Sequence, residues 1–124
     1  MNILLIEDDK LMRSGLSSVL LDWGYTVSAV SNGQEALDFV AKNNQVDLII
    51  CDIFMPVLSG PSFLLQLKKY FQGQFPKVLI MSSVKNPDEF FKSIDVKHDA
   101  FLSKPLDFNQ LKNVLTNLFS AKKI

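Results

Sequence analysis

The sequence predicts an α/β fold in which helices cover both faces of a parallel β-sheet. Short apolar runs alternate along the chain with longer segments whose apolar residues recur every three or four positions. Apolar runs of this length are too short for helices and are typical of strands that are buried on both faces. Because strand and helix patterns alternate along the whole chain, one sheet with helices on its two sides is the expected arrangement.

Five strands are expected, at residues 3–6, 25–30, 47–51, 78–81 and 100–102. Four of them are nearly continuous apolar runs. The second alternates instead, with Tyr25, Val27 and Ala29 on one side, and a turn at residues 31–33 ends it. The alternation is typical of a strand with one face toward the core.

Five helices are expected, at residues 11–22, 34–44, 62–71, 87–94 and 108–119. The first places Met12, Leu16 and Leu20 on one stripe and stops before Gly24. Proline suits the first turn of a helix, which favours a start at Pro87 for the fourth. Asp107 is a candidate N-cap for the fifth.

Composition favours a single domain over residues 1–124 that lies in the cytoplasm. Hydrophobic residues make up 48% of the 124 and charged residues 21%, as in ordinary globular domains. Thirteen basic residues balance thirteen acidic ones, which gives no electrostatic reason for direct nucleic-acid binding. No apolar run is long enough to insert into a membrane, and no signal-peptide pattern opens the chain. Cys51 is the one cysteine, so an intrachain disulfide is excluded and a place in the core is expected.

Polar side chains follow four of the five expected strands. They are Glu7, Asp8 and Asp9 after the first, Asp52 after the third, Ser82 after the fourth and Lys104 after the fifth. The carboxyl ends of parallel strands meet at one edge of the sheet, where ligands of such folds bind, so these side chains are expected to converge. Asp9 is expected to be a solvated cap at the start of the first helix.

This set of side chains suits phosphoryl transfer with Mg²⁺. Crowded carboxylates raise one another's pKa unless a cation lies among them, and hard oxygen ligands suit Mg²⁺, which often also binds a phosphate. Lys104 can balance one carboxylate, Ser82 can donate a hydrogen bond to a phosphoryl group, and an aspartate can itself be the nucleophile. The chain has no Cys/His cluster for zinc and no EF-hand loop.

Four motifs resemble those of the receiver (response-regulator) domain of bacterial two-component signalling, the family of the chemotaxis regulator. They are ILLIEDD at the first strand, DIFMPVLSG after the third, VLIMSS at the fourth and AFLSKP at the fifth. The match covers essentially the whole chain. The resemblance implies a flavodoxin-like α/β fold with a five-stranded parallel sheet of order 2-1-3-4-5 and five helices on both faces.

The resemblance implies a role for each residue at this edge. Asp52 is implied as the phosphoacceptor. The implied metal ligands for the cofactor Mg²⁺ are Asp8 and Asp52 directly, Glu7 through water, and the backbone carbonyl of Phe54. Ser82 and Lys104 are implied to contact the phosphoryl group, Ser82 and Phe101 to form the switch, and the Lys104–Pro105 peptide bond to be cis.

The implied function is a phosphorylation-activated switch rather than an enzyme in the usual sense, since the domain catalyses only its own phosphorylation and slow dephosphorylation. The implied donor is a sensor histidine kinase or a histidine phosphotransfer protein. Phosphorylation would change the surface formed by the fourth helix, the fifth strand and the fifth helix, which would bind an unidentified downstream protein. A dimer through the last helix on activation is compatible with this scheme.

Two other functions remain open. A binding module that keeps the fold without phosphorylation would normally lose an acid, the acceptor or the lysine, and this chain has all of them. Phosphatases of the haloacid-dehalogenase type need a second aspartate two positions after the nucleophile as acid–base catalyst, but Phe54 stands there. The chain also departs from the receiver pattern at Lys97 and His98, where the family often has Gly-Ala before the fifth strand.

Overall fold

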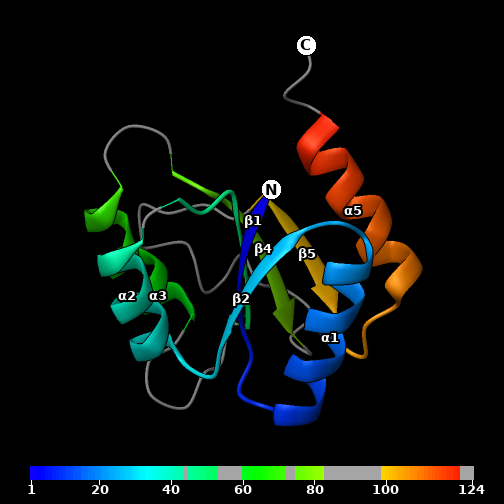
Figure 1. The fold of residues 1–124 in the computed structure, drawn as a ribbon, viewed down its shortest axis with the longest axis horizontal. Helices are drawn as coiled ribbons and strands as arrows, with labels where there is room; N and C mark the ends of the chain where they lie inside the picture. The colour runs from blue at the N-terminus through cyan, green and yellow to red at the C-terminus, as the bar shows by residue number, and fades with distance from the viewer. Residues whose placement is uncertain (44, 53–59, 72–74, 83–98, 121–124) are drawn as a thin grey trace.

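A computed structural model describes residues 1–43, 45–52, 60–71, 75–82 and 99–120 of the chain. Its five strands form one sheet of order β2-β1-β3-β4-β5 in which every neighbouring pair is parallel, which confirms the predicted fold class (Figure 1). The strands are β1 (Asn2–Ile6), β2 (Thr26–Val30), β3 (Leu48–Asp52), β4 (Lys77–Ser82) and β5 (Ala100–Ser103).

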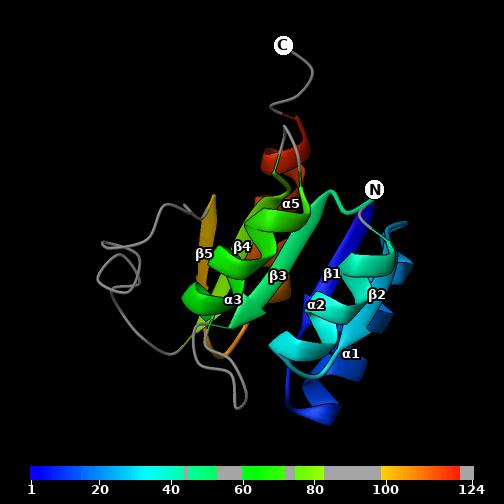
Figure 2. The same cartoon turned by 90° about the vertical axis from the view of Figure 1, so that its left-hand side faces the viewer.

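Four α-helices are described, and they lie on the two faces of the sheet. They are α1 (Lys10–Asp22), α2 (Gly33–Lys42), α3 (Gly60–Leu67) and α5 (Phe108–Ser120). Figures 1 and 2 show α1 and α5 on one face and α2 and α3 on the other. The third helix starts two residues earlier than predicted and ends in a tighter 3₁₀ turn, Lys68–Tyr70. The predicted helix at 87–94 lies outside the described residues.

Two apolar clusters, one on each face, form the core. Along β1, Leu4 and Ile6 join the cluster under α2 and α3, whereas Ile3 and Leu5 join the cluster under α1 and α5. The strand is therefore buried on both sides, which is why its sequence is continuously apolar. Each fully buried side chain of this size contributes about 1.5–3 kcal/mol, so the core fixes the positions of the strand ends.

The edge strand β2 differs from the pattern predicted for it. Tyr25 and Val27 pack against the cluster under α1 and α5, but Ala29 is exposed. Val30 packs against the cluster on the opposite face. Because β2 pairs with β1 alone and lies at the sheet edge, its last residues are not covered on the α1 side.

Side-chain caps set where three helices begin. Met12 N donates to Asp9 Oδ2 at 2.9 Å, which confirms Asp9 as the cap of α1. Glu35 N donates to Asn32 Oδ1 at 2.9 Å at the start of α2. Asp107 accepts from Asn109 N at 2.8 Å, as predicted for α5. Each cap satisfies an amide that the helix itself leaves unpaired.

Cys51 lies fully buried in β3, as expected for a cysteine that acts as a small core residue. Burial, together with the charge of neighbouring Asp52, raises the pKa of its thiol to about 12. Among the described helices, none combines the length and the apolar character that a membrane crossing requires.

Two glycines in and after α1 should respond oppositely to substitution. Gly15 is exposed within α1 and a Cβ there meets nothing within 4 Å, so Gly15→Ala should raise the free energy of unfolding by about 0.5–1 kcal/mol. Gly24 has φ +96°, so Gly24→Ala should lower it by about 1–2 kcal/mol. Urea unfolding of both variants checks this; an unchanged midpoint for Gly24→Ala would contradict the backbone argument.

Candidate functional site

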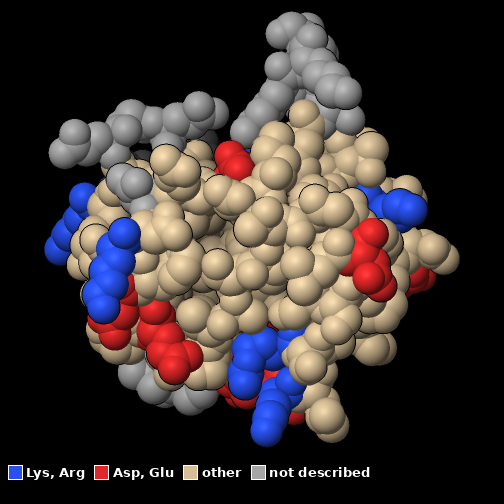
Figure 3. All heavy atoms as spheres, viewed as in Figure 1, with Lys and Arg blue, Asp and Glu red and all other residues tan. Residues whose placement is uncertain are grey.

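The carboxyl ends of four strands meet at one edge of the sheet and carry the predicted site residues. Asp52 is the last residue of β3 and pairs in register with Met81 of β4. Ser82, which ends β4, pairs with Ser103 of β5, and Ser82 O accepts from Lys104 N at 3.0 Å. Figure 3 shows basic side chains beside acidic ones at the lower end of the molecule, the end where β4 and β5 finish in Figure 1.

Lys104 joins two carboxylates that are far apart in the sequence. Its Nζ donates to Asp52 Oδ2 at 2.7 Å and to Glu7 Oε1 at 3.0 Å. The side chain of Glu7 is 1% exposed and that of Asp52 is 14% exposed. Charged groups this well buried need a partner, and the ammonium supplies it through charge-assisted hydrogen bonds. This arrangement explains why a carboxylate ends a buried apolar strand.

Glu7 is held at both of its carboxylate oxygens. Oε1 accepts from Lys104, and Oε2 accepts from Asp9 N at 3.1 Å. Burial raises the pKa of Glu7 above its ordinary value, while the bonds from Asp9 and Lys104 oppose the rise. Burial also works to lower the pKa of Lys104, but the hydrogen bonds to Asp52 and Glu7 outweigh it and raise that pKa. The ammonium therefore stays charged at neutral pH.

The loop from β1 to α1 carries a contact that the sequence did not predict. Arg13 Nη1, one turn into α1, donates to the carbonyl oxygen of Glu7 at 2.8 Å and to that of Asp8 at 3.4 Å. The arginine thus reaches back over the acidic loop. No sequence motif pointed to it, because an arginine in the first turns of a helix is usually a surface residue.

The oxygen donors at this edge suit Mg²⁺ chemically, although the described part of the chain contains no preassembled group of three His, Cys, Asp or Glu side chains for a metal. Asp8 is exposed and Asp52 is partly exposed, so both are open to an ion from solvent. Each carboxylate oxygen of Glu7 accepts one hydrogen bond, from Lys104 Nζ or Asp9 N, and keeps a lone pair for a metal-bound water. Phe54, the fourth predicted ligand, lies outside the described residues.

The predicted switch residues lie on the two strands beyond Asp52. Ser82 is 1% exposed at the end of β4. Phe101 is half-buried in β5 and packs against the apolar cluster under α2 and α3. The Lys104–Pro105 peptide bond is cis, as the resemblance implied. Ser82 is thus beside the edge that holds Lys104, while Phe101 lies further back along its strand.

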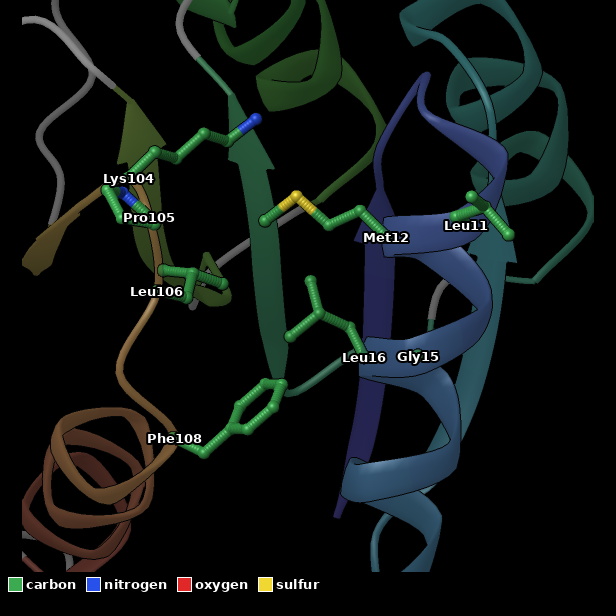
Figure 4. A pocket seen from close by; sticks show the side chains of 8 residues that line it. All are labelled: Leu11, Met12, Gly15, Leu16, Lys104, Pro105, Leu106 and Phe108. Atoms are coloured by element: carbon green, nitrogen blue, oxygen red, sulfur yellow. The ribbon is translucent and has the colours of Figure 1, made fainter.

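An apolar cavity of about 370 Å³, which the sequence did not predict, lies next to Lys104, between α1 and the segment after β5. Its lining comprises Leu11, Met12, Gly15, Leu16, Lys104, Pro105, Leu106 and Phe108. Figure 4 shows Met12, Leu16 and Phe108 pointing into this space, whereas the Lys104 amine points toward the carboxyl end of β3. Leu11 is 84% exposed and Phe108 is 46% exposed at its margins.

The opposite pKa shifts of two glutamates predict opposite pH effects on stability. The pKa of Glu7 is raised from 4.5 chiefly by burial, so its contribution to stability is full below pH 4.5 and is lost as pH rises through the shifted value. Glu7→Gln should therefore gain stability relative to wild type as pH rises from about 4 to 7, by at most about 1.4 kcal/mol per pH unit.

Glu35 is the matched control. Hydrogen bonds from Ser31 lower its pKa from 4.5, so its contribution is present above pH 4.5 and is lost as pH falls. Glu35→Gln should lose stability relative to wild type over the same pH rise. Urea unfolding in EDTA at several pH values measures the difference in free energy of unfolding between each variant and wild type. If this difference changed with pH in the same direction for both variants, the argument from the burial of Glu7 would be contradicted.

Comparison with known proteins places the chain in a family. The family model described as the response regulator receiver domain matches residues 3–116. A relative from Pyropia yezoensis, named "Probable transcriptional regulator ycf29", is 32% identical over 95% of this chain and 53% of its own length. The sensor kinase CckA of Brucella abortus is 32% identical over 97% of this chain and 13% of its own length. The chain thus spans about half, or less, of these relatives.

Solved structures agree with the family match. The chemotaxis protein CheY4 of Vibrio cholerae superposes with a TM-score of 0.83 at 28% identity, over 94% of this chain and 96% of that one. The strand order, the four motifs at the strand ends and the match over residues 3–116 all belong to one family. This chain is a member of the response regulator receiver domain family of two-component signalling.

Proposed function

We propose that residues 1–124 form a single receiver domain that Asp52 switches on by accepting a phosphoryl group. The observation that carries the proposal is the Lys104 ammonium bound to Asp52 Oδ2 at 2.7 Å. The ammonium holds a positive charge beside the carboxylate, where phosphoryl oxygens would arrive. Positioning and charge neutralisation are the main requirements of phosphoryl transfer.

The donor in this proposal is a phosphohistidine on a sensor histidine kinase or a histidine phosphotransfer protein. A carboxylate oxygen of Asp52 attacks phosphorus, the phosphorus–nitrogen bond breaks, and the histidine leaves as a neutral imidazole after taking a proton. The product is an aspartyl phosphate. Lys104 then exchanges its bond to the carboxylate for one to a phosphoryl oxygen, with Glu7 still holding it from the other side.

Mg²⁺ is the proposed cofactor, held by Asp8, Asp52 and the backbone carbonyl of Phe54, and by Glu7 through water. When bound, it supplies positive charge to the phosphoryl oxygens. Glu7 can accept from a metal-bound water while it keeps its hydrogen bonds from Lys104 and Asp9 N, because each carboxylate oxygen has a second lone pair.

Ser82 and Phe101 are the proposed switch. The phosphoryl group adds charge beside the end of β4, and the Ser82 hydroxyl donates a hydrogen bond to it. Because β4 and β5 are paired there and Ser82 O bonds Lys104 N, a shift at Ser82 is passed to β5 and to Phe101. Such a local charge change biases a two-state element. The surface of β5 and α5 together with residues 87–94 then binds a downstream protein or a second copy.

The cavity beside Lys104 is the proposed contact for the phosphodonor protein. A protein that brings a phosphohistidine to Asp52 must rest close to Lys104, and Leu11 and Phe108 expose apolar surface there. Exposed apolar side chains around a hollow are typical of protein-binding surfaces. A small donor such as acetyl phosphate has no need of this contact.

Intact mass after incubation with acetyl phosphate and Mg²⁺ tests the acceptor. Wild type should gain one phosphoryl group, and Asp52→Asn and an EDTA-treated sample should gain none. Beryllofluoride, which imitates the phosphoryl group, is the second reagent, because the domain could fail to react with acetyl phosphate and still bind beryllofluoride at Asp52. If neither reagent changes the mass or the amide signals of Ser82 and Phe101, the domain is a binding module without phosphorylation.

Substitution at Leu11 tests the donor contact. Phosphotransfer to Leu11→Lys from autophosphorylated histidine kinases should be slower by about ten-fold or more, while phosphorylation by acetyl phosphate stays at the wild-type rate. Leu21→Lys is the matched control, because Leu21 is 55% exposed on the same helix, roughly 15 Å further along its axis. Equal rates for the two variants with the kinase would place the donor elsewhere.

A further inference from the structure

The guanidinium of Arg13 binds the backbone of the acidic loop rather than any carboxylate in the site. Its Nη1 donates to the carbonyl oxygens of two successive residues, Glu7 at 2.8 Å and Asp8 at 3.4 Å. The backbone of Arg13 is anchored in the first turn of α1, where its amide donates to Asp9 O at 2.9 Å. Asp9 in turn caps that helix.

These contacts matter because the positions of the Glu7 and Asp8 carboxylates depend on the loop backbone to different degrees. The Glu7 carboxylate is buried and held by Lys104 and the Asp9 amide, so its position is secured by its own side-chain bonds. The Asp8 side chain is exposed, and apart from its contact with the Glu7 carboxyl its direction depends on the orientation of the peptide units on either side of it. Arg13 binds the carbonyls of both of those units.

We propose that Arg13 is a positioning residue that aims the Asp8 carboxylate at the metal side of the phosphoacceptor site by clamping the carbonyls of Glu7 and Asp8. This inference rests on the proposed function, since it concerns the affinity of that site for Mg²⁺. A guanidinium suits the task, because its planar N–H groups diverge at fixed angles and it keeps its charge at every relevant pH. Residues that orient metal ligands commonly change metal affinity when they are replaced.

The charge of Arg13 and its geometry act on Mg²⁺ in opposite directions. As a cation near the acids, Arg13 repels Mg²⁺, so loss of the charge alone should tighten binding. As a clamp it orders the loop, so loss of the clamp should weaken binding. We expect the clamp to dominate, because the Arg13 charge is partly exposed and therefore screened by water and salt, whereas the loop geometry is not.

Calorimetric Mg²⁺ titration of the metal-free protein separates these effects. Arg13→Met, which removes charge and hydrogen bonds, should weaken Mg²⁺ binding by about ten-fold. Arg13→Lys, which keeps the charge and one donor group, should recover part of that loss. Lys10→Met is the matched control, because it removes an exposed positive charge from the start of the same helix; it should leave the affinity unchanged or slightly tighter.

Two further measurements distinguish a defect in Mg²⁺ binding from a loss of stability or of phosphorylation. Urea unfolding in EDTA reports any loss of stability, and a variant that is merely less stable will show a normal Mg²⁺ affinity while folded. Phosphorylation by acetyl phosphate should return to near the wild-type rate in Arg13→Met once Mg²⁺ is saturating, because the defect lies in binding the ion. Unchanged or tighter Mg²⁺ binding by Arg13→Met overturns the proposal, even if phosphorylation of wild type at Asp52 is demonstrated. Failure of wild type to bind Mg²⁺ overturns it together with the metal part of the proposed function.

Discussion

The site depends on the two charge-assisted hydrogen bonds that Lys104 donates to Glu7 and Asp52. Three ends of the sheet, after β1, β3 and β5, are tied together by one ammonium group at 2.7 and 3.0 Å. Removal of that cation would leave two carboxylates facing each other in a largely buried place, which is strongly unfavourable. The same three groups belong to the proposed phosphoacceptor site, so the structural role of Lys104 and its proposed chemical role coincide at this point.

Lys104 can make these two hydrogen bonds only because the sheet is parallel and buried on both faces. In a parallel sheet all strands end at the same edge, and the two apolar clusters hold each strand in a single register. A slip of one residue would reverse every side chain between the two faces. The core therefore positions the strand ends that carry the carboxylate of Asp52 and the ammonium of Lys104.

The loop between β1 and α1 is organised differently, by polar contacts rather than by packing. Asp9 caps α1 and its amide holds Glu7, while Arg13 returns from the helix to the loop carbonyls. Beside this loop, α1 and the segment after β5 leave an apolar cavity open to a partner. Helix α1 thus links the acidic residues on one side to a candidate docking surface on the other.

Sequence by itself determined the fold class, four strand-end motifs and the residue types of the site. Local signals carry these features, because a strand buried on both faces must be continuously apolar, and a charged residue at its end must have a chemical reason. The caps Asp9 and Asp107 were likewise predictable, since a cap acts on amides two or three residues away. The burial pattern was predicted less well at the edge strand β2, where Ala29 is exposed because β2 has a neighbouring strand on one side alone.

Only the tertiary structure decided which partners those residues have. Lys104 contacts residues 52 and 97 positions away, and no local pattern encodes that it bonds Glu7 as well as Asp52. Arg13 and the cavity under Phe108 were missed for the same reason, because an arginine or phenylalanine on a helix looks alike whether it meets solvent, a carbonyl or a neighbouring helix. Chain composition specifies what each side chain can do, while packing of distant segments decides what it meets.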